Sequence, residues 1–195
     1  MSDAQISRFS APQLQEMPAD IRERIEAVQE KSGFVPNVFL ALAARPDEFR
    51  AFFSHHDALM EKSEGLSKAE REMIVVATSS ANACHYCVVA HGAILRIRAK
   101  NPLLADQVAI NYLKADLSKR ERDILDFAML VCEASHKVDD VALEGMRTKG
   151  FSDDEIWDIG AITAFFAMSN RMANLTGMRP NDEFYSMGRN LPGKS

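Results

Sequence analysis

One segment of the chain, residues 72–91, holds four side chains whose types and spacing suit redox chemistry. It reads EMIVVATSSANACHYCVVAH, with Glu72 at its start and His91 at its end. Between them, Cys84 and Cys87 form a Cys-x-x-Cys pair. In a helix that begins at Cys84, both cysteines and the histidine lie on one face, because positions i, i+3 and i+7 share a face. The pattern predicts a reactive dithiol with an acid–base partner.

The chemistry of such a dithiol depends on making one sulfur a thiolate. A free cysteine with a pKa of about 8.5 is only about 3% ionised at neutral pH. The N–H groups at a helix N-terminus and an imidazole one turn along both favour the thiolate. Lowering the pKa by ~2 units corresponds to about 2.7 kcal/mol. We expect His91 to take the thiol proton and Glu72 to orient the imidazole.

The same pair of cysteines can complete a redox cycle. A hydroperoxide would oxidise the thiolate to a sulfenic acid, and the second cysteine would condense with it to a disulfide. An external dithiol would then reduce the disulfide. Cysteines at i and i+3 of a helix have Cβ atoms roughly 5–6 Å apart, whereas a disulfide needs ~3.5–4.5 Å. The first helical turn must therefore adjust during each cycle.

The elements that must position these residues are predicted to be helices. Ser67, Ser118 and Ser152 are each followed three residues later by glutamate, the pattern of a capping box. Neither Asn-Gly nor Asp-Gly occurs, and alternation with a period of two is not sustained, so the usual signs of strands are missing. The expected helices span residues 20–32, 37–44, 46–63, 67–82, 84–99, 102–114, 118–136, 138–149 and 152–176.

We therefore expect an all-α protein, a single-domain helical bundle. Its parts would be an N-terminal arm over residues 1–19, a helical domain over 20–178 and a C-terminal tail over 179–195. Two similar starts, at residues 65–67 and 150–152, each open a long apolar helix. This echo indicates either a degenerate duplicated hairpin or merely two capped helices that resemble each other. In either case the second copy lacks the reactive residues.

Composition limits the class of protein. The 195 residues are 47% apolar and carry a net charge of −5, which suits one globular core and excludes general disorder. The pI near 5.6 and the lack of a Lys/Arg stripe argue against nucleic-acid binding. No apolar stretch reaches the ~18 residues of a membrane span. The N-terminus also lacks the apolar segment of a signal peptide, so we expect a cytoplasmic protein without membrane partners.

The reactive segment resembles the alkylhydroperoxidase D-like group of the carboxymuconolactone decarboxylase superfamily. That group has Glu, eleven residues, Cys, two residues, Cys, three residues and His. This chain has Glu72, Cys84, Cys87 and His91 at those intervals. The flanking stretches PNVFLALAARPDEFRAFFSHHDAL and FFAMSNRMAN are similar to the peroxidase-related branch of the group. The likeness covers about residues 20–185.

The resemblance implies an all-helical fold and homo-oligomers, either trimers or hexamers. It makes Cys87 the peroxidatic cysteine, Cys84 the resolving cysteine, His91 the general base and Glu72 the proton-relay residue. It implies an oxidoreductase without a cofactor or metal that reduces hydrogen peroxide or an organic hydroperoxide. An external dithiol, thioredoxin-like or lipoyl-bearing, would be the reductant. With these roles, we expect His91 to lower the pKa of Cys87.

The chain departs from the group at one position. Alkylhydroperoxidase D has a functional histidine just before its second cysteine, where this chain has Tyr86. A phenol cannot act as a base near pH 7. We expect either a simpler relay or partial substitution by His85, which makes both residues candidate accessory groups. The departure leaves the peroxidase efficiency open.

Other interpretations of the segment remain. A decarboxylase of the same superfamily, acting on a lactone acid, would have no use for the cysteine pair. A non-enzymatic redox sensor or zinc-binding protein is the other alternative. Zinc normally takes four ligands, and the two thiolates with His91 would need Glu72 or His85 as the fourth.

Polar residues outside the segment have simpler interpretations. Cys132 lies in an apolar stretch and is predicted to be an inert core residue. His55 or His56 is a candidate for lining a substrate channel. The apolar stretch 159–168 suggests subunit contacts. Interhelical or intersubunit hydrogen bonds are expected for three polar residues that follow this stretch: Asn170, Arg171 and Asn174.

Overall fold

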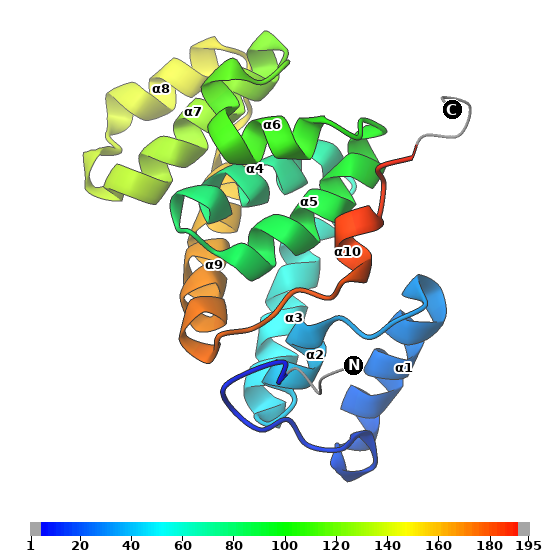
Figure 1. Ribbon diagram of the computed structural model, residues 1–195. Helices are drawn as coiled ribbons and strands as arrows, with labels where there is room; N and C mark the ends of the chain where they lie inside the picture. Colours follow the sequence, from blue (N-terminus) through cyan, green and yellow to red (C-terminus); the bar gives the residue numbers. More distant parts are fainter. Residues whose placement is uncertain (1–4, 191–195) are drawn as a thin grey trace.

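A computed structural model describes residues 5–190, and every regular element in that part of the chain is helical (Figure 1). The all-α expectation is confirmed. The outer parts of the predicted arm and tail, residues 1–4 and 191–195, lie outside the described residues. The α-helices are α1 (Ala19–Ser32), α2 (Asn37–Leu42), α3 (Pro46–Met60), α4 (Lys68–Ala81), α5 (His85–Ala99), α6 (Leu104–Asn111), α7 (Lys119–Ala134), α8 (Asp140–Thr148), α9 (Asp153–Thr176) and α10 (Glu183–Ser186). The 3-10 turns are η1 (Leu14–Glu16), η2 (Tyr112–Lys114) and η3 (Ser135–Lys137).

Three long helices begin where the sequence places capping boxes. The side chains of Ser67, Ser118 and Ser152 each accept a hydrogen bond from the backbone N–H three residues on. The glutamate at that position accepts the N–H of the capping serine in return. Each box satisfies two donors that the first turn would otherwise leave unpaired. The predicted starts of α4, α7 and α9 are confirmed.

The central helix of the core is α4, which packs against α5, α7 and α9 (Figure 1). Its residues 70–79 are all buried. Arg71 is fully buried and donates to the carbonyl of Leu59 at 2.8 Å and to Oδ2 of Asp158 on α9 at 3.0 Å. A buried charge is tolerated only with such partners. This network therefore fixes α4 against α9 and against the end of α3.

A second, aromatic cluster joins the first three helices. Phe39 stacks on Phe53 with ring centroids 4.2 Å apart, and Phe49 lies 4.5 Å from Phe53. The neighbouring Phe52 contacts Phe165 of α9 at 4.9 Å. Such aromatic pairs add to the stability given by burial alone. Helix α3 thereby connects this cluster to the main core.

The described ends of the chain pack onto the helical domain. The backbone N–H of Arg8 donates to the carbonyl of Thr176, the last residue of α9. Phe184 of α10 is buried, and Arg96 of α5 donates to its carbonyl at 2.7 Å. Residues 5–18 and 179–190, the described parts of the predicted arm and tail, thus make contacts with α9 and α5.

The internal echo does not correspond to a duplicated hairpin. Helices α4 and α5 are separated by a sharp break at which Ala83 has a φ of 49°. The region compared with them, α9, is a single helix from Asp153 to Thr176. The similarity is thus confined to the helix starts, because both begin with the same type of cap.

The apolar stretch 159–168 lies in the middle of α9, and half of its residues are buried within the same chain. Ile159, Ile162, Phe165 and Phe166 are all at most 4% exposed. Burial in the core explains the apolar character of this stretch. The stretch is therefore not the evidence for subunit contacts that we inferred from the sequence. None of the helices in residues 5–190 combines the length and hydropathy that crossing a membrane requires.

Candidate active site

The break between α4 and α5 places Cys84 at a helix N-terminus. Asn82 ends α4, Ala83 takes a left-handed conformation, and Cys84 is the N-cap of α5. Its Sγ accepts a hydrogen bond from the backbone N–H of Cys87 at 3.4 Å. The two cysteines are 0% and 2% exposed. The dithiol is therefore buried where unpaired helix N–H groups favour a negative charge.

The predicted carboxylate–imidazole pair is present. Nδ1 of His91 on α5 lies 2.7 Å from Oε2 of Glu72 on α4. Glu72 is 2% exposed, and its other oxygen lies 3.3 Å from Nη1 of Arg98. The arginine compensates the charge of the buried carboxylate. Because the carboxylate occupies Nδ1, Nε2 of His91 is the nitrogen left to exchange protons.

The two sulfurs differ in acidity. The hydrogen bond with Cys87 is the main reason that the pKa of Cys84 is lowered to about 7, and the Cys87 N–H and the charge of His91 act in the same direction. The hydrogen bond to Cys84 and burial raise the pKa of Cys87 well above its ordinary value. The resting charge therefore lies on Cys84. The sequence-based expectation places the acidic sulfur at Cys87. Here only one of the two adjacent buried sulfurs can be an anion, and the helix N-terminus favours the capping Cys84.

Helix α9 contributes two residues to the site that the motif does not contain. Asn170 is fully buried, and its Nδ2 donates to Oγ of Ser79 at 2.9 Å while its Oδ1 accepts from Nδ2 of Asn82 at 3.0 Å. Hydrogen bonding from Asn170 lowers the pKa of both cysteines, and Ser169 lowers that of Cys87. The sequence predicts interhelical hydrogen bonds for Asn170, and these are confirmed. Its place beside the sulfurs is not visible in the sequence because α9 is remote along the chain.

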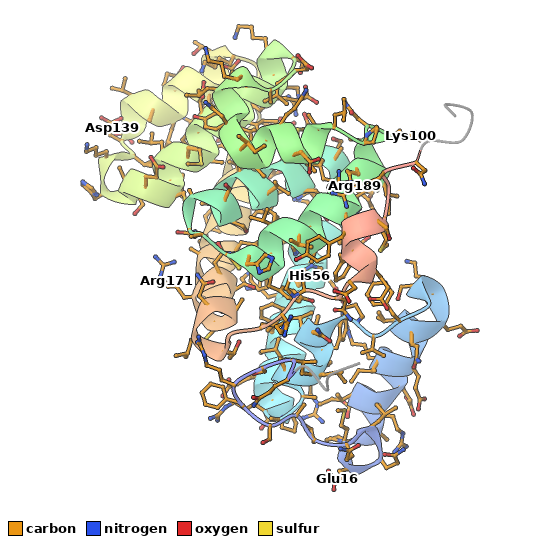
Figure 2. The ribbon with its side chains drawn as sticks, in the orientation of Figure 1. Glu16, His56, Lys100, Asp139, Arg171 and Arg189 are labelled. Atoms are coloured by element: carbon orange, nitrogen blue, oxygen red, sulfur yellow. The ribbon has the colours of Figure 1, made fainter. Side chains whose placement is uncertain are left out.

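The other two polar residues of this helix have different surroundings. Asn174 makes an interhelical hydrogen bond, from its Nδ2 to the carbonyl of Asn82 at 3.3 Å. Arg171 is exposed at the outer edge of α9 (Figure 2). Its guanidinium bonds to the carbonyl of Ala167 in the same helix, so no interhelical bond from Arg171 is found within residues 5–190.

The two residues between the cysteines, His85 and Tyr86, have hydrogen-bond partners other than Glu72 and His91. His85 is exposed, and its Nε2 lies 2.8 Å from the hydroxyl of Tyr185. Tyr86 is buried, its hydroxyl accepts the backbone N–H of Val38 at 3.2 Å, and burial raises its pKa. Tyr86 thus holds the start of α2 in the cluster that contains the dithiol. In this conformation, His85 does not take the place of the missing histidine.

Of the two adjacent histidines of α3, only His56 lies near the Glu72–His91 pair. Its ring centroid lies 6.4 Å from that of His91 and 6.3 Å from that of Phe166, near the middle of the molecule (Figure 2). His55 is exposed, and its ring packs against Phe165. Burial and then the charge of His91 lower the pKa of His56. Consecutive helical residues point about 100° apart, so only the packing of α3 could distinguish the two.

The structure gives little support to a reactive role for the third cysteine or to the zinc alternative. Cys132 on α7 is half-buried, and burial raises its pKa, which disfavours its thiolate. Nδ2 of Asn82 lies 3.7 Å from its sulfur. Among the described residues, no group of three or more His, Cys, Asp or Glu side chains is arranged to hold a metal ion. The donor set that a zinc site requires is therefore not assembled in this part of the chain.

Solved structures share this fold over nearly the whole chain. A peroxidase-related protein from Ralstonia eutropha JMP134, described as an alkylhydroperoxidase AhpD core, is 66% identical. The match has a TM-score of 0.94 and covers 96% of this chain and 98% of that one. A peroxidase-related protein from Silicibacter sp. TM1040 is 39% identical, with a TM-score of 0.91 over 97% and 99% of the two chains. The chain belongs to the alkylhydroperoxidase D-like, peroxidase-related family.

In this alkylhydroperoxidase D-like protein, residues 46–102 also match the sequence profile of the carboxymuconolactone decarboxylase family. That region contains the whole motif from Glu72 to His91. The debrominase Bmp8 has the same fold, with a TM-score of 0.72 over 94% of this chain and 96% of its own, at 19% identity. None of the curated protein sequences matches the chain at a significant level. The resemblance seen in the sequence is confirmed for family and fold.

Proposed function

We propose that this protein is a thiol-dependent peroxidase that reduces hydrogen peroxide or an organic hydroperoxide through Cys84 and Cys87. The carrying observation is a buried dithiol, with the pKa of Cys84 near 7, in the same site as the Glu72–His91 pair. A thiolate is needed to attack the O–O bond, and a positioned acid is needed to protonate the leaving oxygen. The chain's own side chains supply both groups, and the family's peroxidase-related members support the assignment.

The proposed cycle begins with Cys84 as the thiolate, Cys87 as the thiol and His91 protonated. Cys87 gives its proton to Cys84 and attacks the peroxide, so that the O–O bond breaks and Cys87 becomes a sulfenic acid. His91 protonates the leaving oxygen, which departs as alcohol or water. Cys84 then forms the disulfide while its proton passes through His91 to the hydroxide displaced from Cys87, which leaves as water. Glu72 keeps the imidazole in place throughout.

Two arguments favour different sulfurs for the attack on peroxide. The lowered pKa favours Cys84, and the family resemblance favours Cys87. We assign the attack to Cys87 because a thiolate of lower pKa is a weaker nucleophile. In addition, the Cys84 thiolate already accepts hydrogen bonds from Cys87 and Asn170. In this scheme the Cys84 thiolate is the base that activates its neighbour.

Single-cysteine variants test the assignment. In a Cys132→Ala background, Cys84→Ser should consume one equivalent of peroxide and leave a sulfenic acid on Cys87 that a sulfenate-specific reagent traps. Cys87→Ser should form no sulfenic acid. The opposite pattern exchanges the two roles. Because Cys84→Ser also removes the activating thiolate, it should react more slowly than the protein with both cysteines, and the absence of peroxide consumption by that protein removes the peroxidase proposal altogether. Mass spectrometry locates the modified sulfur.

The cycle closes by reduction of the disulfide, for which we propose an external dithiol that is thioredoxin-like or lipoyl-bearing. Such a partner suits a cytoplasmic protein, because thiols stay reduced in that compartment. Stopped-flow measurement of peroxide consumption with each class of donor tests this step. We expect turnover with at least one dithiol and none with a monothiol of similar potential, since a dithiol releases the mixed disulfide intramolecularly.

The match of residues 46–102 to the decarboxylase family supports one other candidate, a decarboxylase that acts on a lactone acid. That reaction does not require the dithiol. A Cys84→Ser, Cys87→Ser double variant that lost peroxide consumption but kept lactone turnover would favour the decarboxylase. Peroxide consumption by the wild type but not by the double variant, with no lactone turnover by either, would favour the peroxidase.

A further inference from the structure

Ionisable side chains on α3 form a line from the protein surface to the Glu72–His91 pair. Asp57 lines an open cavity of about 460 Å³ between α1 and α3. Both of its oxygens are bonded to Arg24, at 3.0 and 2.8 Å. Oδ1 of Asp57 also lies 3.3 Å from Nδ1 of His56, and the His56 ring faces His91 at the 6.4 Å centroid separation. The line connects a surface cavity with the buried site.

The two imidazoles have matching surroundings. His56 has Asp57 at Nδ1, and His91 has Glu72 at Nδ1. Each carboxylate is paired in turn with an arginine, which for Glu72 is Arg98. A carboxylate at Nδ1 fixes the tautomer and leaves Nε2 of each ring for proton exchange. The separation of the rings is one that a single water molecule can span.

The proposed cycle needs such a route because its proton balance changes within each turn. A pair that holds one proton reduces ROOH to ROH and water only if one further proton enters from outside the pair. Reduction of the disulfide by an external dithiol releases one proton again. The sulfurs are at most 2% exposed, so side chains must carry this proton. The side chain of His91 is itself only 13% exposed.

We propose that His56 is a proton-transfer residue that, with Asp57, moves protons between the cavity under α1 and His91. The inference rests on the proposed peroxidase function and adds to it the route of the proton. His56 acts through His91 and does not touch the sulfurs.

The charges around His56 suit this role. The carboxylates of Asp57 and Glu72 favour protonation of the His56 ring, whereas burial and the charge of His91 oppose it. The arginines paired with these carboxylates weaken their attraction for the proton. Burial is the largest influence, and the pKa of His56 is lowered. His56 therefore does not retain a proton of its own and can pass one inward to His91, which gives up its proton to the leaving oxygen in each turn.

The test compares His56→Gln with His55→Gln, which alters the neighbouring, exposed histidine of the same helix. The protein is supplied with hydrogen peroxide and an excess of dithiol, and the steady rate of peroxide consumption, in which His91 must be protonated again in every turn, is followed between about pH 5 and 8, in H₂O and D₂O. We expect His56→Gln to slow the reaction roughly 10- to 100-fold, to enlarge the solvent isotope effect and to be rescued by added imidazole. His55→Gln should match the wild type.

Two outcomes overturn the inference. An unchanged rate and pH profile in His56→Gln would mean that His91 exchanges protons directly with solvent. A loss of rate that imidazole does not restore, together with a lower Tm, would mean that His56 only packs.

A second measurement separates this inference from the proposed function. In the wild type, NMR titration of the histidine rings should show that His56 and His91 titrate as a coupled pair, and His56→Gln should shift the titration of His91. This result does not depend on peroxide turnover. A wild-type protein that consumes no peroxide with any donor would refute the function but leave the coupling intact. Normal turnover with independent titrations would refute only the role of His56.

Discussion

Cys84 and Cys87 are one helical turn apart, yet the protein holds their protons very differently. The capping position gives Cys84 the N–H of Cys87 and brings the lone pairs of its sulfur to the N-terminus of α5. Cys87 lies inside the first turn, where its own N–H is already used and the neighbouring thiolate repels a second charge. A pair built in this way stores one proton and one negative charge at neutral pH. It is therefore ready for a two-electron reaction without first losing a proton to solvent.

The imidazole of His91 contributes to the acidity of Cys84, so removing it should make the thiolate harder to form. In a Cys132→Ala background, we expect His91→Ala to raise the pH midpoint of Cys84 alkylation from about 7 by up to about 1 unit. The reaction rate with iodoacetamide as a function of pH measures this. His136→Ala, which removes an exposed histidine on η3, is the control. An unchanged midpoint in His91→Ala would exclude His91 from setting the charge of the pair.

Asn170 should act on the same sulfur from the opposite helix. A hydrogen bond to a charged group contributes about 1.5–3 kcal/mol, so we expect Asn170→Ala to raise the Cys84 midpoint by roughly 1 unit or more. Asn174→Ala, one turn further along α9, removes a hydrogen bond to Asn82 without reaching the sulfurs and serves as the control. A lower Tm with an unchanged midpoint would assign Asn170 a purely structural role.

Among the elements, the break between α4 and α5 decides where the chemistry takes place. A continuous helix through residues 82–84 would hydrogen-bond the N–H groups of the first turn and leave no helix N-terminus at Cys84. Helix α9 shows this alternative, because it runs unbroken past Ser169, the position that the echo aligns with Cys84. The break also leaves the first turn of α5 free of a preceding helix, which eases the adjustment that disulfide formation requires.

The break has a conformational cost that a substitution can reveal. Ala83 and Lys100 are the two described non-glycine residues with positive φ, at 49° and 51°. Left-handed backbone costs an L-residue about 1–2 kcal/mol, and glycine avoids most of this at a smaller entropic cost. We expect Ala83→Gly to raise the free energy of unfolding by roughly 0.5–1 kcal/mol, measured by urea denaturation. Lys100→Gly at the end of α5 should give a similar gain away from the sulfurs, and destabilisation by Ala83→Gly would contradict the argument.

At the scale of the whole molecule, four helices meet around the site. The motif lies on α4 and α5, while α9 supplies Asn170 and α3 supplies His56. The buried Arg71–Asp158 pair, 3.0 Å apart, holds α4 and α9 together. Because the interior is closely packed, small shifts of α3 or α9 would change the proton balance of the dithiol. The site therefore depends on the complete bundle rather than on the motif alone.

The outer surface of the bundle supports the proposal that the protein is a homo-oligomer. Val141, Trp157 and Leu175 are 78%, 75% and 59% exposed, and a cavity of about 540 Å³ opens between α7, α8 and α9 beside Trp157. Exposed apolar groups of this size are typical of protein interfaces. We expect light scattering to show a trimer or hexamer. The substitution Trp157→Lys should lower the number of subunits in this assembly. A monomeric wild type would contradict the proposal, and dissociation by Ile110→Lys on α6 instead would place the interface elsewhere.

The sequence by itself predicted the long helices and the four residues on which the proposed function depends. Capping boxes at Ser67, Ser118 and Ser152 follow local hydrogen-bonding rules, so they predict helix starts without knowledge of the fold. The motif from Glu72 to His91 is confined to two consecutive helices, so its spacing already brings the four side chains into one region.

Only the tertiary structure decided which sulfur is charged, which of His55 and His56 approaches the relay, and that Asn170 contacts the dithiol. It also showed that Tyr86 packs against α2 instead of moving protons. These properties depend on burial and on hydrogen bonds between helices that are remote along the chain. Local patterns carry no information about such contacts, because desolvation and charge interactions act through space.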